Sequence, residues 1–123
     1  MPHTTTLDPV DKIITASITG LWTEEDAALL DVELRKLLPQ SGYAQAAIDM
    51  TAAIRYSGTD ARRLTAKILQ DHAITHLAIY NARPAVRILV KILLNLASDA
   101  TVARFFETRE EAVAWLKQER QGK

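Results

Sequence analysis

The residues best suited to chemistry lie in a short polar break, Ser57-Gly58-Thr59-Asp60, directly before an amphipathic helix. A helix N-terminus offers unpaired N–H groups and the positive end of the helix dipole, so a phosphate on a hydroxyl there would be stabilised. The alternative is that Thr59 or Asp60 caps the helix, which is the ordinary use of these residue types. We therefore treat the loop as a candidate phosphoacceptor or partner-binding loop.

Asp49 is the second candidate, because it follows a short apolar run and could support the loop through local hydrogen bonds. It could also act as a general base in an enzyme site shared with Tyr56 and Ser57, which we consider less favoured. His72 and His76 are four residues apart but straddle a predicted helix end, so they need not share a face as metal ligands would. No catalytic residue and no metal ligand is therefore assigned.

Composition excludes several classes of function. Fifteen Lys and Arg balance fifteen Asp and Glu, which disfavours nucleic-acid binding and long-range attraction to an anionic bilayer. The chain has no cysteine, and its four glycines are scattered, so thiol chemistry and a glycine-rich phosphate loop are absent. No cofactor is predicted. The polar N-terminus lacks a signal-peptide pattern, so a cytoplasmic protein without a transmembrane segment is expected.

The elements that must position these residues alternate between strands and helices. Asp8-Pro9 and a β-branched run over 12–19 indicate an N-terminal hairpin that ends at Gly20. Helical spacing of apolar residues and capping patterns at Thr23 and at 108–111 then predict four helices separated by short strands. The helices are expected from residue 24 to a stop at Pro39 with Gly42, over 61–72, over 85–97 and from about 109 to 120. The strands are expected over 43–50 ending near Asp49, over 77–80 and over 102–106. This alternation predicts an α/β fold with a mostly parallel sheet of four to five strands.

The predicted helix over 85–97 is unusually apolar, because Arg87, Lys91 and Asn95 form its only polar stripe. A helix that covers a sheet normally exposes about half of its circumference. The excess indicates burial by a neighbouring helix, a dimer surface, a lipid-facing surface or the wall of an apolar pocket. We expect Leu89 or Leu93 to be the most exposed of the candidate interface residues, which are Ile88, Leu89, Ile92, Leu93 and Leu96.

The order and spelling of these segments resemble the STAS family, in its SpoIIAA-like branch of bacterial anti-sigma factor antagonists. The resemblance is carried by Ile48-Asp49-Met50-Thr51, Leu77-Ala78-Ile79-Tyr80, Arg104-Phe105-Phe106 and the helix containing Glu111-Ala112-Val113-Ala114-Trp115-Leu116. It implies one domain over 1–123 with a core at about 12–118. It also implies about four helices against one sheet and no enzyme activity. Thr59 falls on the family's phosphoacceptor position, although Gly58 and Asp60 replace the flanking Ser and Gly.

The resemblance and the loop favour a non-catalytic regulatory or adaptor domain that binds a protein partner. The apolar helix favours an alternative, a binder of a small apolar ligand or lipid similar to Sec14-type domains. A homodimer through the same helix would satisfy the excess apolar surface equally well.

Overall fold

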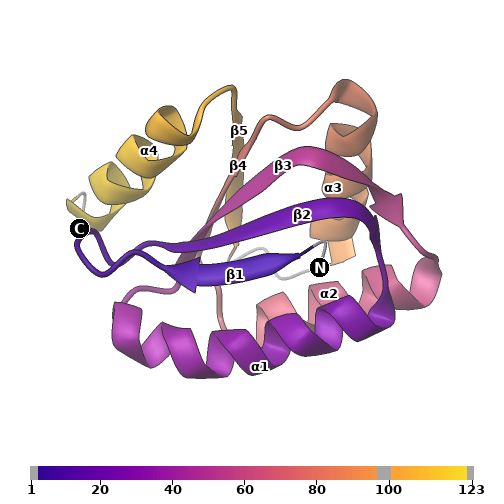
Figure 1. The fold of residues 1–123 in the computed structure, drawn as a ribbon, viewed down its shortest axis with the longest axis horizontal. Coiled ribbons are helices and arrows are strands. Elements are labelled where there is room, and N and C mark those ends of the chain that lie inside the picture. The colour runs from indigo at the N-terminus through magenta and orange to yellow at the C-terminus, as the bar shows by residue number, and fades with distance from the viewer. Residues whose placement is uncertain (1–2, 97–100, 122–123) are drawn as a thin grey trace.

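The computed structural model describes residues 3–96 and 101–121 (Figure 1). Four helices and five strands alternate along the chain. In order they are β1 (Thr4–Leu7), β2 (Ile14–Trp22), α1 (Glu24–Ser41), β3 (Gln45–Tyr56), α2 (Thr59–Asp71), β4 (His76–Tyr80), α3 (Pro84–Leu96), β5 (Val102–Phe106) and α4 (Arg109–Gln121). The predicted helix end at residue 97 lies outside the described residues.

The strands form one sheet in the order β1-β2-β3-β4-β5. β1 and β2 are the antiparallel hairpin expected from the sequence, and every later pair is parallel. The predicted α/β class with a mostly parallel sheet is therefore confirmed. Each parallel connection contains a helix, so β2 to β5 all begin at one edge of the sheet and end at the opposite edge.

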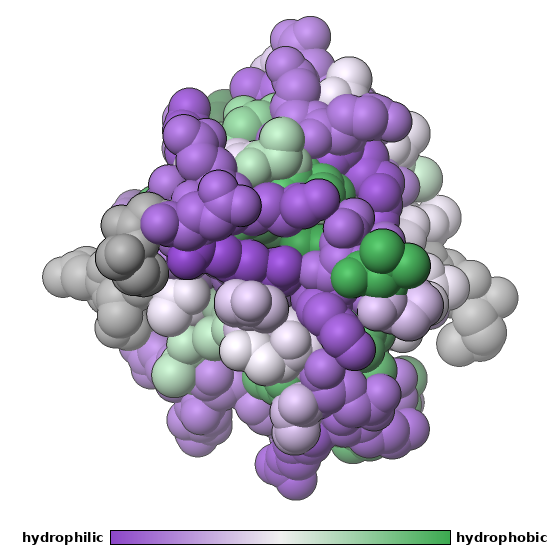
Figure 2. Space-filling view, turned by 90° about the vertical axis from the view of Figure 1, so that its left-hand side faces the viewer, coloured by the Kyte–Doolittle hydropathy of each residue, from purple (hydrophilic) through white to green (hydrophobic). Residues whose placement is uncertain are grey.

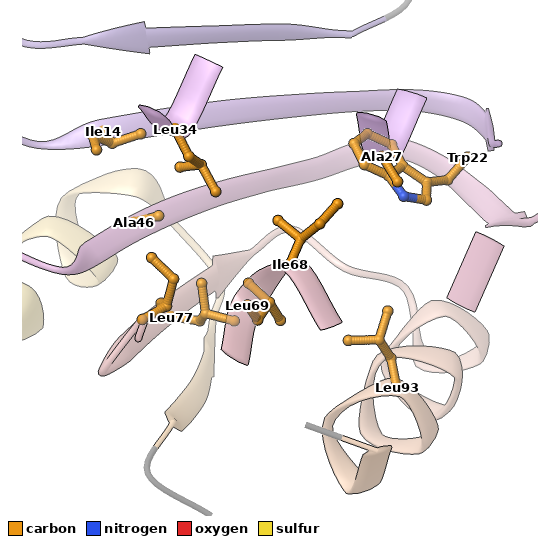
Figure 3. Packing of buried hydrophobic residues seen from close by; sticks show 10 residues of the cluster. Ile14, Trp22, Ala27, Leu34, Ala46, Ile68, Leu69, Leu77 and Leu93 are labelled. Atoms are coloured by element: carbon orange, nitrogen blue, oxygen red, sulfur yellow. The ribbon is translucent and has the colours of Figure 1, made fainter. Parts of the chain in front are cut away.

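Helices cover both faces of this sheet. Adjacent strand residues point to opposite faces, so Ala46 and Leu77 join the core under α1, α2 and α3, whereas Ala47 and Ala78 join the core under α4. Figure 3 shows the first core, in which Leu34, Ile68 and Leu93 point from three helices toward sheet residues such as Ile14, Ala46 and Leu77. All five residues of β4 are buried, as a central strand between two layers requires.

Two helix starts follow their sequence signals, and the end of α1 follows one of its two signals. Thr23 and Asp26 form a capping box at the start of α1, and Thr108 and Glu111 form one at the start of α4. Of the two residues predicted to stop α1, Pro39 lies inside the helix, which continues to Ser41, whereas Gly42 is its C-cap as expected. A proline in the last turn costs one backbone hydrogen bond, and the helix ends where Gly42 adopts a left-handed conformation and its N–H bonds to the Leu38 carbonyl.

β3 is longer than its sequence predicts. It was expected to end near Asp49, which is indeed its last residue paired with β4, but it continues to Tyr56 along β2. The β2–β3 register shifts twice, between Ser17 and Thr19 and between Gly20 and Leu21, and each shift adds one residue to β3. Bulges of this kind bend a strand. After Asp49, β3 pairs only with β2, and the two strands curve together as a two-stranded ribbon (Figure 1).

Candidate functional site

The Ser57–Asp60 loop joins the end of β3 to α2 and includes the first two residues of that helix, and all four residues are exposed. Gly58 is the N-cap of α2 in an extended conformation, and no side chain in the described part of the chain bonds to the first helical N–H groups. The interpretation that Thr59 or Asp60 caps α2 is therefore wrong. Thr59 is already the first helical residue, so its hydroxyl is on the helix surface rather than at the cap.

Trp22 anchors this loop from below. The Ser57 N–H donates to the Trp22 carbonyl at 2.7 Å, and the Trp22 indole Nε1 donates to Thr65 Oγ1 at 2.9 Å. Thr65 in turn donates to the Ala61 carbonyl at 2.7 Å. Both side chains are buried, so this chain of hydrogen bonds fixes the end of β2, the loop and the first turns of α2 relative to one another.

Two arginines follow the loop by one helical turn. Arg62 and Arg63 are three and four residues after Thr59, which places them on the same side of a helix as Thr59. The Arg62 Nε is buried and has no hydrogen-bond partner within the described part of the chain. The opening of α2 thus combines free backbone donors, exposed hydroxyls and two cations, against one acid, Asp60.

Asp49 does not support the loop. It lies in the middle of β3, where its Oδ1 accepts hydrogen bonds from the Thr51 N–H at 3.0 Å and from Thr51 Oγ1 at 2.6 Å. This position is the start of the first register shift, so the carboxylate supports the bulge. Burial raises the pKa of Tyr80, its neighbour on β4, and the charge of Asp49 raises it further.

The three residues of the hypothetical enzyme site are not brought together. Asp49 and Tyr56 are seven positions apart along the strand, which is roughly 20 Å at the rise of a β-strand. The Tyr56 hydroxyl instead donates to the Leu89 carbonyl on α3. Burial raises the pKa of this hydroxyl to about 12, against opposing effects of the Leu93 backbone and the Arg62 charge.

The histidines also lie apart, each with its own acid. His72 Nε2 is 2.7 Å from Asp31 on α1, and His76 Nε2 is 3.3 Å from Glu119 on α4. Because α1 and α4 lie on opposite faces of the sheet, the two rings do not converge. Within residues 3–96 and 101–121, no group of three or more His, Asp or Glu side chains is close enough to hold a metal ion.

An apolar cavity of about 100 Å³ lies between the sheet and the helices on the α1–α3 face. α3 forms one wall of this cavity, and Trp22, which anchors the loop, also lines it. The residues that line it are Ala16, Ile18, Gly20, Trp22, Leu30, Ile48, Met50, Ala53, Arg55, Tyr56, Thr65, Leu69, Leu77, Ile79, Val86, Leu89, Val90, Leu93 and Leu94. Of the explanations offered for the apolar surface of α3, the wall of an apolar pocket therefore applies to the side that faces the sheet.

The outer side of α3 remains apolar and exposed. Ile88 is 61% exposed, Ile92 39% and Leu96 44%, and these residues form one row at spacings of four. The expectation that Leu89 or Leu93 is most exposed is wrong: Leu93 is buried and Leu89 half-buried, because both face the cavity. The face seen in Figure 2, by contrast, is largely hydrophilic with scattered apolar residues. Among the described residues, no helix has the length and hydropathy needed to span a bilayer.

Solved structures with the same architecture define the fold as SpoIIAA-like. An uncharacterised protein of the DUF3478 family with a SpoIIAA-like fold, from Shewanella loihica PV-4, aligns with a TM-score of 0.71 at 19% identity over 93% of each chain. The anti-sigma factor antagonist SpoIIAA in its unphosphorylated form aligns with a TM-score of 0.58 at 10% identity, over 98% of this chain and 100% of SpoIIAA. The predicted resemblance to the SpoIIAA-like branch is thus confirmed for the fold.

Residues 20–120 match the family described as "Domain of unknown function (DUF7793)", and the chain belongs to that family. The match covers most of the chain, from the end of β2 to the last turn of α4. No curated protein matches this sequence. The family assignment therefore carries no activity with it.

Proposed function

We propose that residues 1–123 work as one cytoplasmic, non-catalytic regulatory or adaptor domain that binds a protein partner through the Ser57–Asp60 loop and the outer face of α2. The observation that carries the proposal is the exposed, uncapped opening of α2. Backbone donors that no side chain satisfies are available to a partner's acceptors, and the Trp22 anchor holds them in a fixed position. A rigid, preorganised surface of this kind reduces the entropic cost of binding.

The positions of the chemical residues favour binding over catalysis. The carboxylate of Asp49 is committed to Thr51, and the hydroxyl of Tyr56 is committed to the α3 backbone. An acid–base pair must lie within hydrogen-bond reach of one reacting group. Asp49 and Tyr56 are too far apart for that, whereas a binding surface needs no such convergence. SpoIIAA, an anti-sigma factor antagonist, shares the fold.

Phosphorylation of Thr59 would act on this surface. A phosphate there would stand at the positive end of α2 and within one turn of Arg62 and Arg63, and these interactions offset the repulsion from Asp60. The phosphate would then occupy the free backbone donors and the two arginines, so that the partner could no longer bind them. Thr59, with Ser57 as the other exposed hydroxyl, is therefore the proposed switch.

The test places a photo-crosslinking amino acid at Thr59, with Gln118 on α4 as the matched exposed control on the opposite face. A partner crosslinked only from Thr59 is then purified, and its Kd is measured for the wild type, Thr59→Asp and Ser57→Ala. We expect Thr59→Asp to weaken binding at least tenfold while the melting temperature changes by only a few degrees. Unchanged affinity in both variants would refute the proposal, as would identical crosslinks from Thr59 and Gln118.

The cavity favours a second candidate function, binding of a small apolar ligand. A dry cavity of about 150 Å³ holds benzene, so about 100 Å³ has room for roughly four carbon atoms. A whole lipid, as in Sec14-type carriers, would require α3 to move away from the sheet. Binding of xenon followed by NMR tests the site, with Ala53→Leu as the variant that fills it. Equal xenon shifts in the wild type and Ala53→Leu would rule the cavity out as a ligand site.

A further inference from the structure

The neutral net charge of the chain conceals a separation of charge. Seven of the fifteen Lys and Arg, but only two of the fifteen Asp and Glu, lie between residues 52 and 96. This segment comprises the end of β3, α2, β4 and α3, and the rest of the chain carries the compensating negative charge. A protein of zero net charge can therefore present one cationic face, and electrostatic attraction to an anionic surface depends on that face.

The exposed apolar row of α3 lies within this cationic segment. α3 contains no acid, and Ile88, Ile92 and Leu96 follow one another along its surface. The ribbon end of β3 runs beside the first turns of α3, since Arg83 donates to the Ala53 carbonyl at 2.7 Å and Tyr56 donates to the Leu89 carbonyl. Ile54, in the same part of β3, is 55% exposed.

Cations flank the row on both sides. On the β5 side, Arg87 and Lys91 lie over the Phe105 ring at 5.4 and 5.9 Å. On the other side α2 packs against α3, with Gln70 Nε2 donating to the Leu96 carbonyl at 3.3 Å. Here α2 carries the exposed Arg63 and Lys67, of which Lys67 is paired with Asp71 at 2.7 Å. An apolar stripe between two basic margins is the pattern of helices that lie in a membrane interface.

The solvent exposure of these side chains helps to distinguish a membrane-binding surface from a peptide-binding groove. Arg87 is half-buried, with its Nε donating to the Ala82 carbonyl at 3.0 Å, whereas the neighbouring Ile88 is 61% exposed. In a peptide-binding groove the apolar residues form the floor and the charges form the rim. Here Ile88 is more exposed than the neighbouring Arg87, so it does not form the floor of a groove. This geometry suits insertion of side chains below a layer of anionic headgroups.

We propose that the surface formed by Ile88, Ile92 and Leu96, with its basic margins, docks onto anionic phospholipid bilayers. The occupant is the lipid surface rather than a single extracted lipid, so the inference does not depend on the cavity. It does not depend on the Thr59 switch either. Membrane attachment would leave α4 and the largely hydrophilic face of Figure 2 directed away from the bilayer.

The magnitudes follow from the two contributions. Each Lys or Arg near an anionic surface increases partitioning about fivefold, and this effect is screened within about 8 Å at physiological salt. Burial of an isoleucine side chain contributes at least about tenfold. Partitioning should therefore require anionic lipid, fall steeply with salt, and depend on both charge and apolar side chains.

The experiment measures flotation of the purified chain with vesicles of phosphatidylcholine, with and without 30% phosphatidylglycerol, at about 0.1 and 0.5 M salt. We expect binding only to the anionic vesicles and at the lower salt concentration. Ile88→Gln should weaken it at least tenfold and Lys91→Gln about fivefold. The matched controls are Leu29→Gln and Lys36→Gln on α1, whose side chains are 58% and 63% exposed, and both should bind as the wild type does.

Three results would overturn the proposal: no flotation with anionic vesicles, equal flotation with pure phosphatidylcholine, or an equal effect of Ile88→Gln and Leu29→Gln. Sedimentation of the free protein provides a further check. A dimer that Ile88→Gln dissociates would assign the apolar row to a second copy of the chain instead. Partner binding measured through Thr59 is unaffected by any of these outcomes, so this proposal and the protein-binding proposal fail separately.

Discussion

Replacing Thr65 by valine tests whether the Trp22 anchor holds the candidate loop. Valine keeps the volume and branching of threonine but removes the oxygen that accepts the Trp22 Nε1 hydrogen bond at 2.9 Å. The Trp22 donor would then be buried without a partner, because the side chain is only 8% exposed. Thr65→Val should therefore destabilise the fold by more than the loss of one net hydrogen bond.

The magnitude comes from the cost of an unsatisfied buried donor, which is about 1–3 kcal/mol. Unfolding entropy near 60 °C is about 2.1 cal/mol/K per residue, or about 0.26 kcal/mol/K for this chain. A loss of about 2 kcal/mol then lowers the melting temperature by about 8 °C. The Thr65 hydroxyl also donates to the Ala61 carbonyl, but a helix carbonyl keeps its backbone partner, so this second loss is small.

A double-mutant cycle with Trp22→Phe separates the hydrogen bond from packing. Phenylalanine has no ring N–H, so in that background Thr65→Val leaves no orphaned donor. We expect a coupling free energy of about 1–2 kcal/mol, measured by urea unfolding followed through circular dichroism. Thr65→Val and Trp22→Phe effects that add within about 0.3 kcal/mol would refute the reasoning. They would mean that the indole only packs against α2.

Three further predictions concern backbone and titration. Gly58→Ser should raise the free energy of unfolding by about 0.5–1 kcal/mol, because Gly58 is an uncapped, extended N-cap with open space around its Cβ position, and urea unfolding measures the change. Gly42→Ala should lower it by about 1–2 kcal/mol, since Gly42 has a φ of +79°; a neutral effect would contradict the left-handed C-cap. The pKa of Tyr56 is about 12 in the folded state and about 10 in the unfolded chain, so the unfolded state binds fewer protons between these values. The contribution of Tyr56 to stability should be constant below pH 10 and fall as the pH rises toward 12, so the wild type should lose stability more steeply over this range than Tyr56→Phe.

The local signals of the sequence were sufficient for the order of elements. Capping boxes at Thr23 and Thr108 and the 3–4 spacing of apolar residues located four helices, since these patterns depend only on neighbouring residues. The length of β3 could not be found in this way. Ala52 to Tyr56 combines two alanines, which are depleted in strands, with Ile54 and Tyr56, which are enriched, and the segment is a strand because β2 continues beside it to Trp22.

In the candidate site, too, features set by neighbouring residues were predictable and features set by distant residues were not. The exposed loop before α2 was predicted from Ser57 to Asp60, but its anchor was not, because Trp22 and Thr65 are 43 residues apart and neither has a pattern that reports the pairing. The apolar excess of α3 was also visible in the sequence. Which row it exposes depends on how α3 rotates against β3 and β4, and the contacts of Val86 and Val90 with Ile79 and Ala53 direct Leu93 inward and Ile88 outward.

Trp22 connects the two candidate functions physically. Its carbonyl fixes Ser57 in the loop, and its indole borders the apolar cavity while bonding to Thr65. A ligand that displaced the indole would therefore alter the position of the loop and the first turns of α2. Because coupling between two binding sites is reciprocal, such a ligand would change the affinity of the loop for its partner by the same factor by which the partner changes the affinity of the cavity. A partner whose Kd is identical for the wild type and for Ala53→Leu would show instead that the loop functions independently of the cavity.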